Sequence, residues 1–211
     1  MKYTKYYLLT IAIILVDQII KLAIFKNFQY EGDEIVIAGD WLKLHYITNP
    51  GMAGGIEFGS KYGKIFLSVF RLCAMVGISY YLYIMAKKNM NQGLLWCVAG
   101  ILGGAMGNVV DSTFYGKFLG LVTDDALTPW FHGRVIDMFY VDICDCYIPE
   151  WIPHFGGQFY PLWPIFNFAD ASIFVSVALI LIFQRRYFAE KKETNDSKEK
   201  ESPFLETGCK G

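Results

Sequence analysis

The sequence predicts a mainly α-helical integral membrane protein, a bundle of four membrane-spanning helices with a small external β-module. Of its 211 residues, 54% are hydrophobic and 18% are charged, whereas soluble domains average about 45–50% and about 25%. Four apolar runs are each roughly 20 residues long, the length that crosses a hydrocarbon core of about 30 Å. The net charge of -1 leaves no basic surface for nucleic acid. The length fits one domain, which we expect over residues 1–190.

The first apolar run covers residues 6–25 and lacks the small-residue cleavage site of a signal peptide, so we expect a retained helix. Asp17 and Lys21 interrupt it four residues apart, which allows an ion pair within the helix. Lys21 could alternatively extend to the membrane interface. A carboxylate inside a span normally faces the bundle interior. Asp17 therefore either holds two helices together or has a chemical role.

Residues 26–64 have a different pattern, which predicts two or three short strands outside the membrane. Apolar and polar residues nearly alternate in WLKLHYI, and turn residues precede it. Asn49 then opens the glycine-rich stretch NPGMAGG, which includes Gly51. The simplest interpretation of Asn49 is a turn residue.

The second and third spans are predicted at residues 65–86 and 93–110, joined by the short turn NMNQG. Small residues four apart let helices approach closely in lipid. The third span carries two such neighbouring stripes, and each ends in a polar residue. The stripes are Gly100, Gly104 and Asn108, and Gly103, Gly107 and Asp111.

Residues 111–165 are too long for a simple helix connection. Their many Trp, Tyr and Phe residues favour a segment that lies on the membrane interface. The fourth span is predicted at residues 166–184, and residues 191–211 form a polar tail.

Lysines and arginines predict the orientation. They gather at the N-terminus, at Lys87–Lys88 and at Arg185–Arg186. With four spans these all fall on one side, so both termini and the tail are expected in the cytoplasm. The external segments are then 26–64 and 111–165. Several polar residues would meet at this outer surface, namely Asn49, Asp111, Asp137, Asn167 and Asp170.

Two aspartates lie in apolar stretches at that surface, Asp137 in GRVIDMF and Asp170 in FNFAD. Two carboxylates in a low-dielectric site share one proton. The ionised member can take a proton from water, and the protonated member can donate to a scissile carbonyl oxygen. This is the chemistry of peptide hydrolysis without a metal. The alternative for Asp170 is a helix-entry residue that binds backbone N–H groups.

Other function classes remain possible on the residues alone. The three histidines and five cysteines show no spacing typical of a metal site, and we expect no metal or other cofactor. A small ion-coupled transporter would suit Asp17 and the glycine stripes, although no internal repeat is visible. A non-catalytic lipid-binding membrane protein would tolerate the loss of either aspartate.

Five motifs, in this order, resemble those of the bacterial lipoprotein signal peptidase family, also called signal peptidase II. They are DQIIK, NPGMAGG, GNVVD, RVIDMF and FNFAD. The resemblance implies an aspartyl endopeptidase of the bacterial cytoplasmic (inner) membrane. It would remove signal peptides from diacylglyceryl-modified prolipoproteins, cutting before the lipidated cysteine at the outer face. Membrane lipids and globomycin-type inhibitors are the other implied partners.

The resemblance also assigns residues. Asp137 and Asp170 would be catalytic, and an external helical loop within residues 111–165 would close over the site. A supporting and substrate-binding frame would contain Asp17, Lys21, Asn49, Gly51, Gly107, Asn108, Asp111, Arg134, Asn167 and Ala169.

The sequence departs from the family pattern in two respects. Ser112 stands where the family often has arginine, so either Arg134 supplies that cation or the substrate is anchored differently. Residues 117–131 and 144–163 resemble insertions, and the second contains Cys144 and Cys146, whose redox state the sequence leaves open.

Overall fold

The structure is a computed structural model, and it describes the greater part of the chain in several ranges. These are residues 3–50, 63–123, 126–143, 145–147, 149–151, 157, 159–161 and 163–188. Gly51, Cys144 and the predicted tail at residues 191–211 lie outside the described residues.

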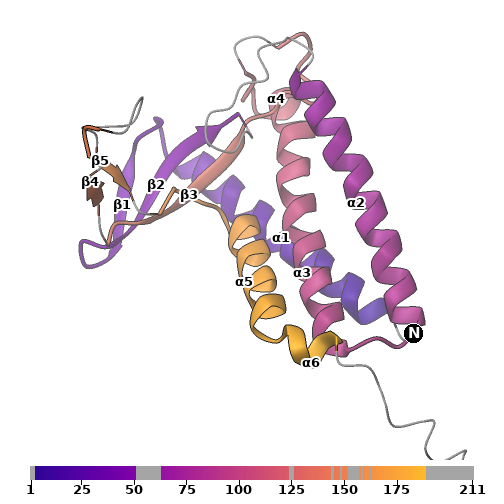
Figure 1. The fold of residues 1–211 in the computed structure, drawn as a ribbon. Helices are drawn as coiled ribbons and strands as arrows, with labels where there is room; N and C mark the ends of the chain where they lie inside the picture. Colours follow the sequence, from indigo (N-terminus) through magenta and orange to yellow (C-terminus); the bar gives the residue numbers. More distant parts are fainter. Residues whose placement is uncertain are drawn as a thin grey trace, which may run out of the picture.

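Long helices dominate the fold (Figure 1). They are α1 (Thr4–Asn27), α2 (Gly63–Lys87), α3 (Gln92–Val110) and α5 (Phe168–Ile182), and the short helix α6 (Gln184–Phe188) follows α5. Beyond Val110, α3 runs on through a π-helical turn, Asp111–Tyr115, into the short helix α4, Gly116–Phe118. Three helical stretches are long and apolar enough to cross a membrane, and they match the first three predicted spans.

The fourth predicted span has a different form. Helix α5 is apolar but has only 15 residues, which is about 22 Å of helix. It ends at Ile182, Phe183 caps it, and α6 continues the chain from Gln184. The four-span count of the sequence prediction is therefore not confirmed by helix length.

A small antiparallel sheet stands beside one end of the helices (Figure 1). Two of its strands, β1 (Glu34–Ala38) and β2 (Leu42–Asn49), come from residues 26–64, as the alternation predicted. The third strand, β3 (Val135–Val141), comes from the long aromatic segment and pairs with β2. A second pair is formed by β4 (Asp145–Tyr147) and β5 (Phe159–Pro161). The segment predicted to lie on the interface thus contributes a strand to the β-module.

Helix α3 lies at the centre of the bundle because its glycines admit close neighbours. A side chain at Gly104 would collide with the carbonyl oxygen of Ala169 and with Ser172 on α5. On the neighbouring stripe, one at Gly103 would meet Ile13 on α1. Both predicted glycine stripes are therefore helix contacts, one toward α5 and one toward α1.

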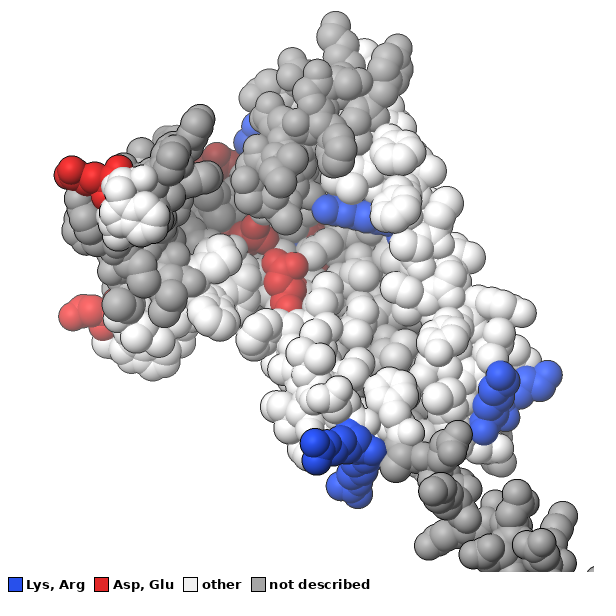
Figure 2. Space-filling view, viewed as in Figure 1, with Lys and Arg blue, Asp and Glu red and all other residues white. Residues whose placement is uncertain are grey.

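The N-terminus, the α2–α3 turn and α6 meet at the end of the bundle opposite the sheet (Figure 1). Lys5 donates a hydrogen bond to the side chain of Gln92 at 3.1 Å, and Asn91 donates to the backbone oxygen of Arg186 at 3.4 Å. Figure 2 shows clusters of lysine and arginine at this end, and the acidic side chains nearer the sheet. The charge asymmetry expected for a membrane protein is present in the fold.

Candidate active site

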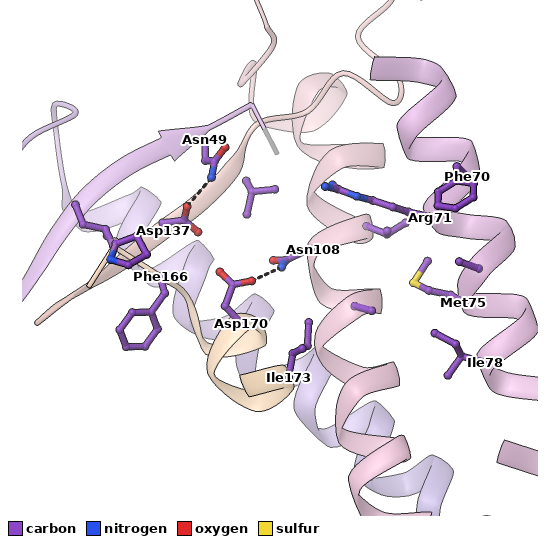
Figure 3. A pocket seen from close by; sticks show the side chains of 16 residues that line it. Asn49, Phe70, Arg71, Met75, Ile78, Asn108, Asp137, Phe166, Asp170 and Ile173 are labelled. Atoms are coloured by element: carbon purple, nitrogen blue, oxygen red, sulfur yellow. Dashed lines mark hydrogen bonds between the residues drawn. The ribbon is translucent and has the colours of Figure 1, made fainter. Parts of the chain in front are cut away.

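A cavity of about 590 Å³ opens between α2, α3, α5 and the end of the sheet (Figure 3). Its polar lining includes the carboxylates of Asp137 and Asp170 and the guanidinium of Arg71. Much of the remaining wall is apolar, with Phe70, Ala74, Met75, Ile78, Ala105, Val109 and Ile173. The two aspartates that the sequence predicted to meet therefore line one cavity.

Asp170 belongs to a capping box at the start of α5. The Asn167 side-chain oxygen accepts a hydrogen bond from the Asp170 backbone N–H at 2.9 Å, and Asp170 Oδ2 accepts from the Asn167 backbone N–H at 3.4 Å. The other carboxylate oxygen, Oδ1, accepts from Asn108 Nδ2 at 2.8 Å. Capping and a place in the cavity are thus compatible, because the two oxygens have different partners.

Asp137 reaches the cavity from the sheet. Its strand lies beside β2, where Asn49 Nδ2 donates to Asp137 Oδ2 at 3.3 Å. Asn167 Nδ2 donates to Asp137 Oδ1 at 2.6 Å. A backbone bridge between Phe139 and Phe166, with hydrogen bonds of 2.8 and 3.1 Å, fixes β3 against the start of α5. This bridge explains why two residues 33 positions apart can share a cavity.

Burial, and after it the negative charge of Asp170, raise the pKa of Asp137 from 3.8 to about 7. The hydrogen bonds from Asn167 and Asn49 act in the opposite direction but are outweighed. The side chain is only 3% exposed. Asp137 can therefore still carry a proton near neutral pH.

A closed ionic cluster lies behind the cavity. Lys21 Nζ binds Asp17 Oδ2 at 2.8 Å and Asp111 Oδ2 at 2.6 Å, and all three side chains have 0% exposure. The predicted ion pair between Asp17 and Lys21 is confirmed, and extension of Lys21 to the interface is wrong. Asp17 Oδ1 also accepts the backbone N–H of Ala169 at 2.9 Å. Asp17 therefore holds α1 against the start of α5.

The cluster determines how the amides of the site are oriented. Lys21 can only donate, and it donates to Asn108 Oδ1 at 2.9 Å, so Asn108 Nδ2 is left for Asp170. The oxygen of Asn167 is similarly occupied by the helix cap, and its Nδ2 turns to Asp137. Each carboxylate thus receives an amide N–H.

Gly107, Arg134 and Ser112 lie near the site but outside the lining of the cavity. Gly107 packs where a side chain would collide with Asp17 and Ala169. Arg134 Nη1 donates to Thr48 Oγ1 at 3.2 Å, and Arg134 does not line the cavity. Ser112 is buried and donates to the backbone oxygen of Asn108.

Arg71 lines the cavity but was absent from the predicted site. Its signal in the sequence was a lone arginine inside the apolar run of residues 65–86. Among the residues that the structure describes, no three His, Cys, Asp or Glu side chains group as metal ligands.

The chain is similar to known proteins over most of its length. Residues 9–185 match a family model described as signal peptidase (SPase) II. The lipoprotein signal peptidase of Amoebophilus asiaticus is 39% identical over 98% of this chain and 89% of its own. That of Porphyromonas gingivalis is 37% identical over 82% and 80% of the two chains.

Solved structures extend the comparison to the fold. One bacterial membrane enzyme, solved at 2.3 Å, has a TM-score of 0.57 at 24% identity and covers 91% of this chain and 94% of its own. A second, solved at 1.9 Å, has a TM-score of 0.54 at 22% identity. At these identities the likeness concerns the fold alone.

Proposed function

The chain belongs to the signal peptidase II family, and from that premise we propose that Asp137 and Asp170 are its catalytic pair. Like the lipoprotein signal peptidases it resembles, the protein is an aspartic-type protease that removes signal peptides from prolipoproteins. Family membership does not support a transporter or a non-catalytic lipid-binding protein. The observation behind the catalytic assignment is that both carboxylates line one largely apolar cavity.

The two aspartates have different environments, which suggests different roles. Asp170 lies in the first turn of α5, where the positive end of the helix dipole favours a negative charge. Asp137 is buried on a strand, and its pKa is raised to about 7. In the proposed mechanism Asp170 is the ionised base and Asp137 carries the proton.

In the proposed reaction one water molecule lies between the two carboxyl groups. Asp170 accepts a proton from this water while the water oxygen bonds to the carbonyl carbon of the scissile peptide. Asp137 donates its proton to the carbonyl oxygen, and a tetrahedral intermediate forms. The intermediate then breaks the C–N bond as the leaving nitrogen takes the proton from Asp170, and Asp137 recovers its own from the hydroxyl group.

The apolar wall of the cavity suits a substrate that arrives through the membrane. Phe70, Met75 and Ile78 on α2 face Ile173 on α5 across it (Figure 3). We propose that the chains of the diacylglyceryl group lie against this wall, with cleavage before the modified cysteine. A globomycin-type inhibitor would occupy the same cavity, and membrane lipids would border it.

The polar frame holds the pair without reacting in this proposal. Asn49, Asn108 and Asn167 donate hydrogen bonds to the carboxylates. Behind them lie Asp17, Lys21, Asp111, Gly107 and Ala169, while Arg134 supports β2 through Thr48. Gly51 and a closing loop within residues 111–165 remain part of the proposed site through the family resemblance.

We also propose that the protein crosses the bacterial cytoplasmic (inner) membrane four times, as one domain over residues 1–190. Helix α5 supplies about 22 Å of apolar helix, and α6, which leaves it at an angle (Figure 1), carries the chain to the basic end of the bundle. The basic end of the bundle would then be cytoplasmic, together with both termini. The cavity and the sheet would lie at the outer face.

The test is cleavage of a diacylglyceryl-modified prolipoprotein by purified protein in detergent. Asp137→Asn and Asp170→Asn keep the shape of the side chain but remove the carboxyl group, so each is expected to lower the rate at least about a hundredfold. Asp142→Asn, a matched change on the sheet surface where Asp142 binds Lys43, should retain wild-type activity. Near-normal cleavage by either dyad variant would disprove the assignment.

A further inference from the structure

Arg71 is the cation of the cavity. Among the described residues that line it, the charged ones are Arg71, Asp137 and Asp170. Arg71 comes from α2, across the cavity from α5, and its side chain extends toward α3 and Asn108 (Figure 3). The proposed mechanism of two carboxylates and a water does not require it. Its place beside the reacting groups therefore needs a separate explanation.

Arg71 is a charged residue in apolar surroundings, so exposure to solvent alone does not explain its position. Its neighbours on the same face of α2 are apolar, namely Phe70, Ala74, Met75 and Ile78. It lies in a helix long and apolar enough to cross a membrane. A charged side chain in such a helix is expensive and normally faces a polar cavity or a partner, which marks a functional site. Here the side chain faces the cavity that holds the two carboxylates.

Two cations lie near Asp170, Arg71 on the cavity wall and Lys21 in the buried cluster, and they differ in their partners. Asp170 interacts electrostatically with Arg71 and with Asp137. A cluster with one positive and two negative groups lies behind Asn108, and there Lys21 is shared by two carboxylates. The charged groups that share the cavity with Asp170 are thus Arg71 from α2 and Asp137 from β3. Behind Asn108 lie Asp17 and Lys21 from α1, and Asp111 from the π-helical turn after α3.

Each carboxylate already has two hydrogen-bond donors, so hydrogen bonding alone does not distinguish them. Asp137 accepts hydrogen bonds from Asn49 and Asn167. Asp170 accepts them from the Asn108 side chain and from the backbone N–H of Asn167. What differs is charge, because Arg71 lines the same cavity and interacts electrostatically with Asp170, whereas it is not among the charges that act on Asp137. An opposite charge nearby favours the ionised form of a carboxyl group.

We infer that Arg71 is a positioning residue of the cleavage reaction, whose guanidinium keeps Asp170 in the ionised form that activates water. This inference rests on the proposed catalytic pair. The cation of the cavity then comes from α2, and Arg134, the cation expected from the sequence, lies outside the cavity lining. Arg71 acts through Asp170 and need not contact the substrate.

The test measures kcat and KM separately between pH 3 and 9 for Arg71→Met, Arg71→Gln and Arg71→Lys. Loss of the charge should move the acidic limb of the kcat/KM profile upward by about one pH unit. At a pH on that limb, the rate should fall about tenfold with KM unchanged. Arg71→Lys should stay within about threefold of wild type at every pH. Lys43→Met, a charge removed from the sheet surface, is the matched control.

The outcomes separate this inference from the catalytic assignment. An acidic limb that stays in place in both neutral variants would overturn the role of Arg71, as would a change confined to KM. Equal loss in Arg71→Lys would overturn it too, because the charge would then not be the property that matters. Thermal unfolding of each variant in detergent identifies any that is misfolded, and the remaining neutral variant decides. The dyad itself fails only if Asp137→Asn or Asp170→Asn cleaves normally.

Discussion

Asp17 Oδ1 accepts a hydrogen bond from the backbone N–H of Ala169 at 2.9 Å, although the two residues are 152 positions apart. Ala169 precedes Asp170, so this contact places one carboxylate of the proposed pair relative to the first helix of the chain. The other oxygen of Asp17 binds Lys21 at 2.8 Å. A buried ionic cluster of Asp17, Lys21 and Asp111 therefore supports the site on the side away from the cavity.

Removing the cation of the cluster should be strongly destabilising. Lys21→Met leaves Asp17 and Asp111 buried side by side without their shared partner, and breaking a buried pair in this way costs about 3–5 kcal/mol. We expect a marked fall in the thermal unfolding midpoint in detergent. Lys26→Met, on an exposed position of the same helix, should leave the midpoint nearly unchanged. Equal midpoints for the two variants would contradict the proposed role of the cluster.

Reversing the polarity of one amide should reduce catalysis more than stability. In Asn108→Asp a carboxylate oxygen replaces the Nδ2 that donates to Asp170 at 2.8 Å, so two acceptors would face each other. We expect cleavage to fall about a hundredfold, because a hydrogen bond to a charged group is lost and repulsion replaces it. Asn91→Asp, at the N-cap of α3 where Asp caps equally well, should cleave normally. A normal rate for Asn108→Asp would show that this bond does not position Asp170.

A methyl group on the central helix should disturb the start of α5. The added Cβ in Gly104→Ala would collide with the carbonyl oxygen of Ala169 and with Ser172. Because backbone must move to relieve this contact, we expect a loss of about 1–3 kcal/mol and a lower cleavage rate. At Gly77 on α2 a Cβ meets nothing within 4 Å, so Gly77→Ala is the matched control. Unfolding midpoints and rates that agree between the two variants would be evidence against the close α3–α5 contact.

Stability should depend on pH through Asp137. Its pKa is about 7 in the folded protein, above the ordinary value of 3.8, so between these values the folded state binds more protons. The free energy of unfolding therefore falls as pH rises from about 4 to 7, by up to about 4 kcal/mol from this group. Asp137→Asn should show a flatter dependence, measured by denaturation in detergent at several pH values. Asp40→Asn, in the exposed turn between β1 and β2, controls for the substitution, and identical slopes would refute the shift.

The same protonation predicts the alkaline limb of activity. As pH rises through about 7, Asp137 loses the proton that the proposed mechanism gives to the carbonyl oxygen. The value of kcat/KM should then decrease with increasing pH, approaching tenfold per unit well above this value. A rate that remains constant to pH 9 would exclude Asp137 as the proton donor.

Much of this arrangement was predictable from local patterns. Apolar length identified α1, α2 and α3, and alternation identified β1 and β2, because these signals lie within single segments. The spacing of Gly103 and Gly104 anticipated close helix contacts. The spacing of Asp17 and Lys21 similarly predicted their ion pair.

Other features depend on contacts between distant segments and leave weak local signals. The third strand of the sheet, β3, lies in a segment dominated by aromatic residues, and only pairing with β2 establishes it. Lys21 is fully buried because Asp111 comes to it from α3, a partner that the pattern within α1 could not provide. Arg71 was likewise visible only as an interruption in an apolar run. Its relation to Asp170 requires α2 and α5 to border one cavity.

The bridge between Phe139 and Phe166 has a consequence for biosynthesis. Both acids and the clamp at Ala169 belong to the last part of the membrane domain to leave the ribosome, and the strand that carries Asp137 docks on one made about 90 residues earlier. With Asp137 and Asp170 as the proposed pair, a nascent chain that has inserted only its first three helices would have no functional hydrolase. We therefore expect proteolytic activity in the membrane to begin only when the enzyme is almost complete.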